Sequence, residues 1–139
     1  MSREILIGID TGVKTGFAVW DIQSKKLLEV STYSILEAME RVMHCKSGES
    51  ELKGLYIEDA RKVKYKTSAI KAQGAGSIKR DCQIWEEFTI RHKIKATFLR
   101  PNKKLTKFSK GKFGQITGWE KRSSEHARDA AMLVYGRAF

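Results

Sequence analysis

Hydrophobic and polar positions along the chain follow two kinds of pattern. Residues 5–9 read Ile-Leu-Ile-Gly-Ile, an apolar block typical of a strand buried on both faces. Similar short blocks recur between turn residues. They predict strands at Glu4–Ile9, Phe17–Asp21, Lys26–Thr32, Leu55–Asp59 and Ala96–Leu99. The first three follow one another closely, so we expect an antiparallel meander.

Apolar positions at helical spacing predict three helices, each with a cap residue. Ser34 with Glu37 three residues later is a capping-box pattern. Ser77 is expected to cap a long central helix, and either Ser123 or Ser124 the last one. The predicted helices extend from Ser34 to His44, from Ser77 to His92 and from Glu125 to Tyr135, before the stop at Gly136.

Two segments between these elements lack a clear period. Lys46–Lys53 is predicted to be a polar loop, and Asn102–Gly118 a basic region with short helical turns. The order is three strands, helix, strand, helix, strand, helix. It predicts an α/β protein with a mixed sheet and helices packed on it.

Composition narrows the class of protein. A chain of 139 residues with 41% hydrophobic residues fits one globular domain over residues 1–139. It has no apolar stretch long enough to span a bilayer and no signal-peptide pattern, so we expect a soluble cytoplasmic protein without a membrane partner. Its two cysteines and three histidines are too scattered for a zinc site or a disulfide framework.

Charge indicates a polyanionic partner. The net charge is +11, from 27 lysines and arginines against 16 acids. Between Arg61 and Lys112 the only acids are Asp81, Glu86 and Glu87, which favours nucleic-acid binding over a merely solvated basic surface. The candidate DNA contacts are Arg61, Lys62, Lys64, Tyr65, Lys66, Lys71, Lys103, Lys104, Lys107, Lys110 and Lys112.

Acidic residues occur where two predicted strands end and where the last helix begins. Asp10 and Glu58 end strands, and His126 and Asp129 are three residues apart on the helix. Such positions converge in a mixed α/β sheet, and their ligand types suit Mg²⁺ or Mn²⁺. Phosphodiester hydrolysis is the reaction class this predicts. Singly, each has an ordinary alternative, such as a turn aspartate, a cross-sheet ion pair or a helix-face histidine.

In their order, three motifs resemble those of the RuvC-like branch of the RNase H-like nucleases, the Holliday junction resolvases, and phage-encoded versions in particular. The strand Ile7-Gly8-Ile9-Asp10-Thr11-Gly12 resembles the family's first motif, and Tyr56-Ile57-Glu58 the strand with the second acid. His126-Ala127-Arg128-Asp129-Ala130 resembles the closing helix. The order and approximate spacing agree over nearly the whole chain.

The resemblance implies an RNase H-like fold, with a central five-stranded mixed sheet flanked by helices. It implies that Asp10, Glu58 and Asp129 hold two divalent ions, Mg²⁺ or Mn²⁺, with His126 completing the site or assisting the nucleophile. The substrate would be branched DNA, cut by a homodimer. The predicted helix Ser77–His92, with Trp85 and Phe88, is the candidate dimer surface, with core packing as the alternative. Tyr65 is a candidate for stacking on DNA bases.

Other functions share single features of this pattern. Asp-Thr-Gly also occurs in aspartic proteases and Asp-x-Gly in sugar-kinase phosphate loops, but those folds need an all-β chain or two domains. A nuclease acting on RNA or RNA–DNA hybrid, or a non-catalytic nucleic-acid-binding module, stays open. The sequence also leaves open whether Glu125 or Asp59 joins the site.

Overall fold

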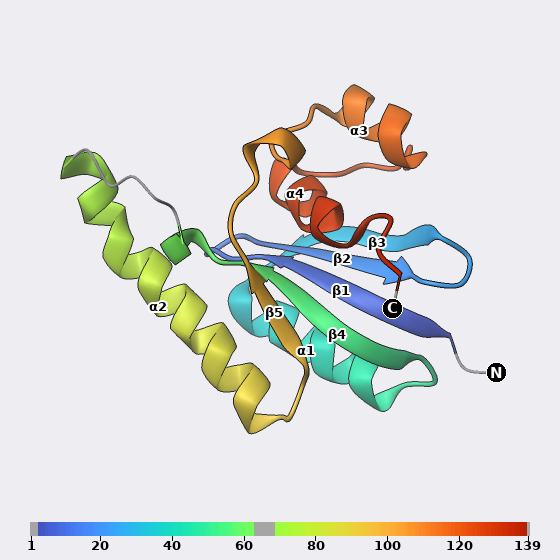
Figure 1. Cartoon of the computed structure of the whole chain (residues 1–139), viewed down its shortest axis with the longest axis horizontal. Helices are drawn as coiled ribbons and strands as arrows, with labels where there is room; N and C mark the ends of the chain where they lie inside the picture. Colours follow the sequence, from blue (N-terminus) through green and yellow to red (C-terminus); the bar gives the residue numbers. More distant parts are fainter. Residues whose placement is uncertain (1–2, 63–68, 139) are drawn as a thin grey trace.

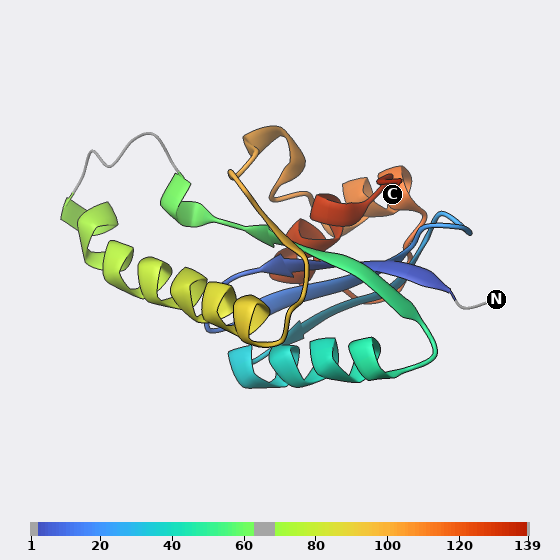
Figure 2. The ribbon, with the colours of Figure 1, turned by 60° about the horizontal axis from the view of Figure 1, so that its bottom comes forward.

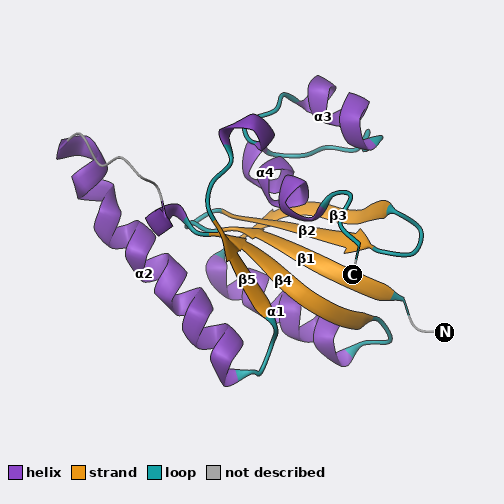
Figure 3. Cartoon of the chain, in the orientation of Figure 1, coloured by secondary structure: helices purple, strands orange, loops and turns teal. Residues whose placement is uncertain are grey.

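One five-stranded sheet organises the protein (Figures 1 and 3). The computed structural model describes residues 3–62 and 69–138, and the side chains of 69–75 are not described. The strands are β1 (Glu4–Asp10), β2 (Thr15–Asp21), β3 (Lys26–Tyr33), β4 (Glu51–Glu58) and β5 (Ala96–Leu99). The helices are α1 (Ile35–Ser47), α2 (Ala69–Arg91), α3 (Lys110–Thr117) and α4 (Glu125–Val134), with short 3₁₀ turns at Ala60–Lys62 and Lys103–Leu105.

The sheet is mixed, as the sequence predicts. Its strand order is β3-β2-β1-β4-β5. β1, β2 and β3 form the predicted antiparallel meander, whereas β4 lies parallel to β1 and to β5. Helix α1 precedes β4 and helix α2 precedes β5, and each helix returns the chain to the edge of the sheet where β1 begins. The carboxyl ends of the parallel strands β1, β4 and β5 therefore meet at the opposite edge.

Strand β4 begins earlier than predicted. Residues 51–53 were expected in a polar loop, yet Glu51 pairs with Glu4 on β1. The Lys53 ammonium lies 3.2 Å from a Glu4 oxygen and 2.9 Å from a Glu51 oxygen. The ion pair between Lys53 and Glu4 stabilises the pairing of β4 with β1 even though the side chains are polar. The hydrophobic pattern of a single strand does not reveal such a cross-strand contact.

Each face of the sheet has its own hydrophobic core. On one face the odd-numbered β1 residues Ile5, Ile7 and Ile9 pack with α1 and with Trp85 of α2. On the other, Leu6 packs against α4 and Phe113 of α3. Figure 2 shows α1 on one side of the sheet and α4 on the other. Alternation along the strands therefore assigns Gly8 and Asp10 to the α4 face.

Helix α1 begins as the sequence predicts. The Ser34 hydroxyl accepts a hydrogen bond from the Glu37 backbone N–H, and the Glu37 carboxylate accepts one from the Ser34 N–H, which is a complete capping box. Ser124, one of the two predicted caps, caps α4.

Helix α2 begins at Ala69, so the prediction that Ser77 caps it was wrong. The preceding residues are mostly good helix formers, and extending a helix is easier than starting one. Ser77 lies inside the helix. The predicted DNA contacts Lys64, Tyr65 and Lys66 lie outside the described residues, as does the side chain of Lys71.

Trp85 and Phe88 belong to the core. Trp85 is fully buried, and Phe88 packs against the same cluster, with the two rings 5.6 Å apart in an edge-to-face arrangement. Of the two alternatives for these residues, core packing is therefore correct. In the described ranges, no helix combines the length and apolar character needed to cross a membrane.

Candidate active site

Two strand ends bring two carboxylates to one edge of the sheet. Asp10 and Glu58 are the last residues of β1 and β4 and are register partners in this parallel pair. Tyr56, two residues before Glu58, packs in the core beneath α4. Both acids therefore belong to the face that α4 covers.

Two glycines allow α4 to lie directly on these strands. Gly16 on β2 is the register partner of Asp10. A Cβ at Gly16 would overlap the carbonyl oxygen of His126, and one at Gly8 would overlap that of Ala130. The α4 residues on this side of the helix are small and fully buried: Ala127, Ala130 and Ala131.

The first turns of α4 carry the other two predicted site residues. His126 Nδ1 lies 3.2 Å from Asp10 Oδ2. The backbone N–H of Lys107 donates a hydrogen bond to Asp129 Oδ1, with an N···O distance of 2.8 Å. Glu58 and Asp129 line the same hollow, about 140 Å³ in volume. The structure thus brings together all four residues that the sequence singled out.

Burial makes this group of acids reluctant to ionise. It raises the pKa of Asp10 to about 6, although the hydrogen bond with His126 acts in the opposite direction. Burial, with the charges of Asp10 and Asp129, raises the pKa of Glu58 to about 7. Burial also raises the pKa of Asp129, against the lowering effect of the Lys107 N–H. Such a group gains most from a nearby cation.

The donor set fits a divalent metal ion. Glu58 Oε2 is buried and has no hydrogen-bond partner among the described residues. Carboxylate oxygens and imidazole nitrogens are ligands for Mg²⁺ or Mn²⁺, and Mg²⁺ keeps several waters and needs few protein ligands. In the described part of the chain, no three acidic, histidine or cysteine side chains form a preformed metal cage.

Asp59 belongs to a separate cluster, although it follows Glu58 directly. Its two oxygens accept hydrogen bonds from Arg61 Nε and Nη2 at 2.8 and 2.7 Å. Arg61 also contacts Glu86 of α2. These hydrogen bonds lower the pKa of the buried Asp59 carboxyl. Asp59 therefore anchors α2 to the end of β4 and is not available as a metal ligand.

Several charged groups surround the acids without having been assigned to the site. Glu125 is the first residue of α4, directly before His126, and its charge is one cause of the raised pKa of both Asp10 and Asp129. Arg100 and Arg137 line the hollow that contains Glu58 and Asp129. No motif marked the two arginines, because only the packing of the segments after β5 and α4 brings them there.

The predicted basic residues differ in their availability. Arg61 is engaged by two acids, and Lys62 Nζ donates to the Phe98 carbonyl oxygen at 2.7 Å. The remaining described candidates are exposed in the segment between β5 and the end of α3. They are Lys103, Lys104, Lys107, Lys110 and Lys112.

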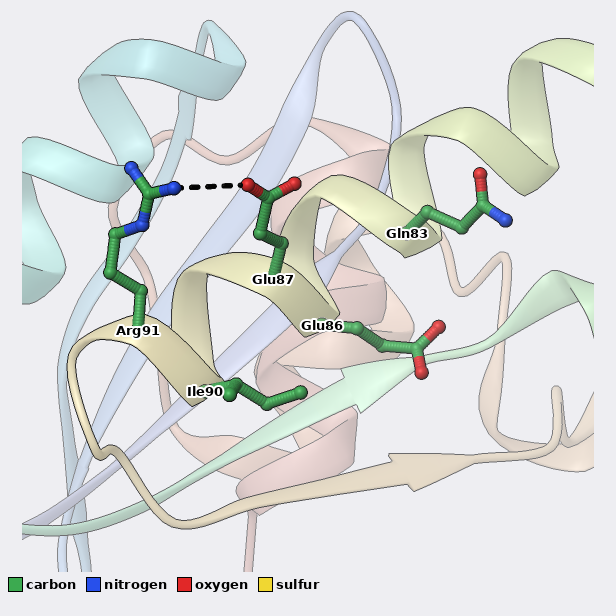
Figure 4. Close-up of a pocket in the computed structure, with 5 residues that line it drawn as sticks. All are labelled: Gln83, Glu86, Glu87, Ile90 and Arg91. Carbon is green, nitrogen blue, oxygen red and sulfur yellow. Dashed lines mark hydrogen bonds and ion pairs between the residues drawn. The ribbon is translucent and has the colours of Figure 1, made fainter.

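A larger hollow, about 590 Å³, lies on the outer side of α2. Figure 4 shows its lining, which comes from one helix and includes the exposed pair Glu87–Arg91. None of the acids at the strand ends contributes to it.

Comparison with solved structures identifies the fold. A structure of Thermus thermophilus RuvC in complex with Holliday junction substrate aligns with 96% of this chain and 91% of that chain, at a TM-score of 0.59 and 12% identity. A second Thermus thermophilus RuvC structure aligns with 94% of this chain and 91% of that chain, at a TM-score of 0.52 and 17% identity. No protein-family model and no curated protein sequence matches the chain. At these identities the alignments establish shared architecture: the protein has the RuvC fold of the RNase H-like class.

Proposed function

We propose that this protein is a metal-dependent endonuclease that resolves Holliday junctions or other branched DNA. The observation behind this proposal is the pairing of Asp10 with Glu58 at the ends of two parallel strands, with His126 and Asp129 of α4 beside them. The solved neighbour with the same fold was captured with a Holliday junction. Fold alone does not fix a function, so the argument depends on the site.

Asp10, Glu58 and Asp129 would hold Mg²⁺, or Mn²⁺ in its place, as two ions per site with His126 alongside. When bound, such ions activate water and stabilise the charge that develops on a phosphodiester. The protein's own contribution is orientation. His126 contacts one Asp10 oxygen, and the Lys107 amide fixes one Asp129 oxygen.

The DNA backbone would contact the exposed lysines after β5. Lys107 connects this surface to the site, since its amide contacts Asp129 while its side chain belongs to the basic segment. Phosphate contacts of this kind supply affinity and position without reading sequence. Lys62, Lys64, Tyr65, Lys66 and Lys71 remain predicted contacts, whereas the ion pairs of Arg61 lead us to leave it out of this surface.

We also propose that two copies associate through the outer side of α2. Ile90 is 76% exposed on this helix and lies in the hollow of Figure 4. Contact between two copies would bury this apolar side chain. Light scattering should show a dimer for the wild type and a monomer for Ile90→Glu. A wild-type monomer at micromolar concentration would contradict this arrangement.

Cleavage of a labelled four-way junction tests the main proposal. We expect cleavage that requires Mg²⁺, and loss of cleavage but not of junction binding in Asp10→Asn and Asp129→Asn. Glu40→Gln, on the exposed side of α1, is the matched control. Cleavage in excess chelator, or in both variants, would exclude the metal mechanism.

Substrate choice separates the alternatives. Linear duplex, four-way junction and RNA–DNA hybrid should be offered under the same conditions. A preference for the hybrid over the junction would favour a nuclease acting on RNA. Junction binding without cleavage in either Mg²⁺ or Mn²⁺ would indicate a non-catalytic binding module.

A further inference from the structure

Arg128 holds both ends of the segment that contains α3. Its Nε donates to the Phe108 carbonyl oxygen at 2.8 Å, and its Nη1 donates to the Ser123 carbonyl oxygen at 2.6 Å and to the Ser123 hydroxyl at 3.2 Å. Phe108 precedes α3 and Ser123 follows it. One side chain on α4 therefore closes the loop that presents Lys110 and Lys112.

Asp129, the next residue of α4, is bound to the same loop. The Lys107 N–H donates to Asp129 Oδ1 at 2.8 Å, and Lys107 immediately precedes Phe108, whose carbonyl Arg128 holds. Adjacent side chains of α4 thus bind adjacent residues of the loop. Lys107 has a φ of 58°, which an L-residue adopts only when its surroundings impose it.

We infer that Arg128 is a positioning residue for Asp129. By fixing Phe108 and Ser123, it keeps the Lys107 amide on Asp129 Oδ1 and so sets the direction of that carboxylate. The role of Asp129 as a metal ligand rests on the proposed function. The contact between Lys107 and Asp129 does not depend on that function, and it joins the loop that carries the exposed lysines to a residue of the site.

The shape of the arginine side chain explains why this position needs it. A guanidinium presents several N–H donors in a fixed fork and can hold two carbonyl groups at once. A lysine at residue 128 keeps the charge but cannot bridge Phe108 and Ser123 in this way. Groups that orient a metal ligand typically change metal affinity 10–100-fold, roughly, when they are removed.

The test compares Arg128→Lys with the wild type and with Arg3→Lys. Arg3 pairs with Asp21 at the opposite end of the sheet from Asp10 and is the matched control. Hydrogen exchange by NMR reports the Lys107 amide, and calorimetry reports Mn²⁺ affinity. We expect Arg128→Lys to lose protection of this amide and to bind Mn²⁺ about tenfold more weakly, whereas Arg3→Lys should change neither.

An unchanged Lys107 amide or unchanged Mn²⁺ affinity in a folded Arg128→Lys would overturn the inference, and so would a wild type that does not bind Mn²⁺. A wild type that binds Mn²⁺ but cuts no DNA would remove the proposed function and leave the inference standing. If Arg128→Lys does not fold, Lys107→Gly decides. Glycine accepts the positive φ and keeps the N–H, so this variant should retain Mn²⁺ affinity while binding DNA more weakly. Weakened Mn²⁺ binding in Lys107→Gly would assign the effect to the lysine side chain and overturn the inference.

Discussion

Asp10 and Glu58 face each other at the last position of the parallel β1–β4 ladder. The charge of Asp10 is one cause of the raised pKa of Glu58. Without a cation, the pair therefore opposes its own ionisation. The free energy of unfolding, measured in chelator so that no metal ion is bound, therefore tests the electrostatics of this site without a catalytic assay.

Glu58→Gln should make the metal-free protein less sensitive to pH. Because the folded-state pKa of Glu58 is raised from 4.5 to about 7, the fold binds this proton more tightly than the unfolded chain does. Its contribution is complete below about pH 4.5 and is lost as the pH rises through 7. At pH 8 the variant should be more stable than the wild type by about 1 kcal/mol, a value reduced for partial exposure.

Urea unfolding in chelator at pH 5 and pH 8 measures this difference. Glu40→Gln should follow the wild type at both values. An equal pH dependence in Glu58→Gln and the wild type would mean that Glu58 is ionised at pH 8 without strain, and the electrostatic description of the site would be wrong.

Gly16→Ala should damage the site through the backbone. The added methyl overlaps the His126 carbonyl oxygen, and neither β2 nor α4 has a flexible side chain there that can move aside. We expect a loss of about 1–3 kcal/mol in stability and a larger loss of cleavage than of DNA binding. Gly111→Ala is the control, because a methyl there meets open space. Wild-type stability and cleavage in Gly16→Ala would show that α4 does not need this close contact.

The sequence predicts the strands well because strands follow local rules. Five apolar blocks gave five strands, and Asp10, Glu58 and Asp129 occupy positions that topology brings together. Arg61 is different: its sequence position favours a DNA contact, whereas Asp59 and Glu86 hold it. The Lys107 amide was also unpredictable, because every residue but proline has such an N–H and only packing decides which one meets Asp129.

Arg61→Gln should lower stability far more than DNA affinity. It leaves the Asp59 carboxylate, 1% exposed, without its bidentate partner. Removing one partner of a buried ion pair costs about 3 kcal/mol. Since the pKa of Asp59 is lowered, the difference should be present at neutral pH and diminish below pH 4. Chemical denaturation measures it. Arg91→Gln, which breaks an exposed pair, is the control. A large loss of junction affinity with normal stability would instead indicate that Arg61 contacts DNA.

Lys103→Ala should reduce the salt dependence of junction binding. Each phosphate contact that is lost lowers the slope of log Kd against log salt by about one. Lys26→Ala, exposed at the start of β3 away from the acids, should leave the slope unchanged. Fluorescence anisotropy over a range of salt concentrations gives both slopes. Identical slopes for wild type and Lys103→Ala would place the DNA elsewhere.

The contact of Gly8 and Gly16 with α4 makes the site robust to changes in the core. Main chain meets main chain at Ala130 and His126, so the separation of helix and strand is set by backbone atoms that no substitution of a core side chain alters. We therefore expect the spacing of the carboxylates to depend more on the missing side chains at Gly8 and Gly16 than on the volume of a core residue such as Leu6.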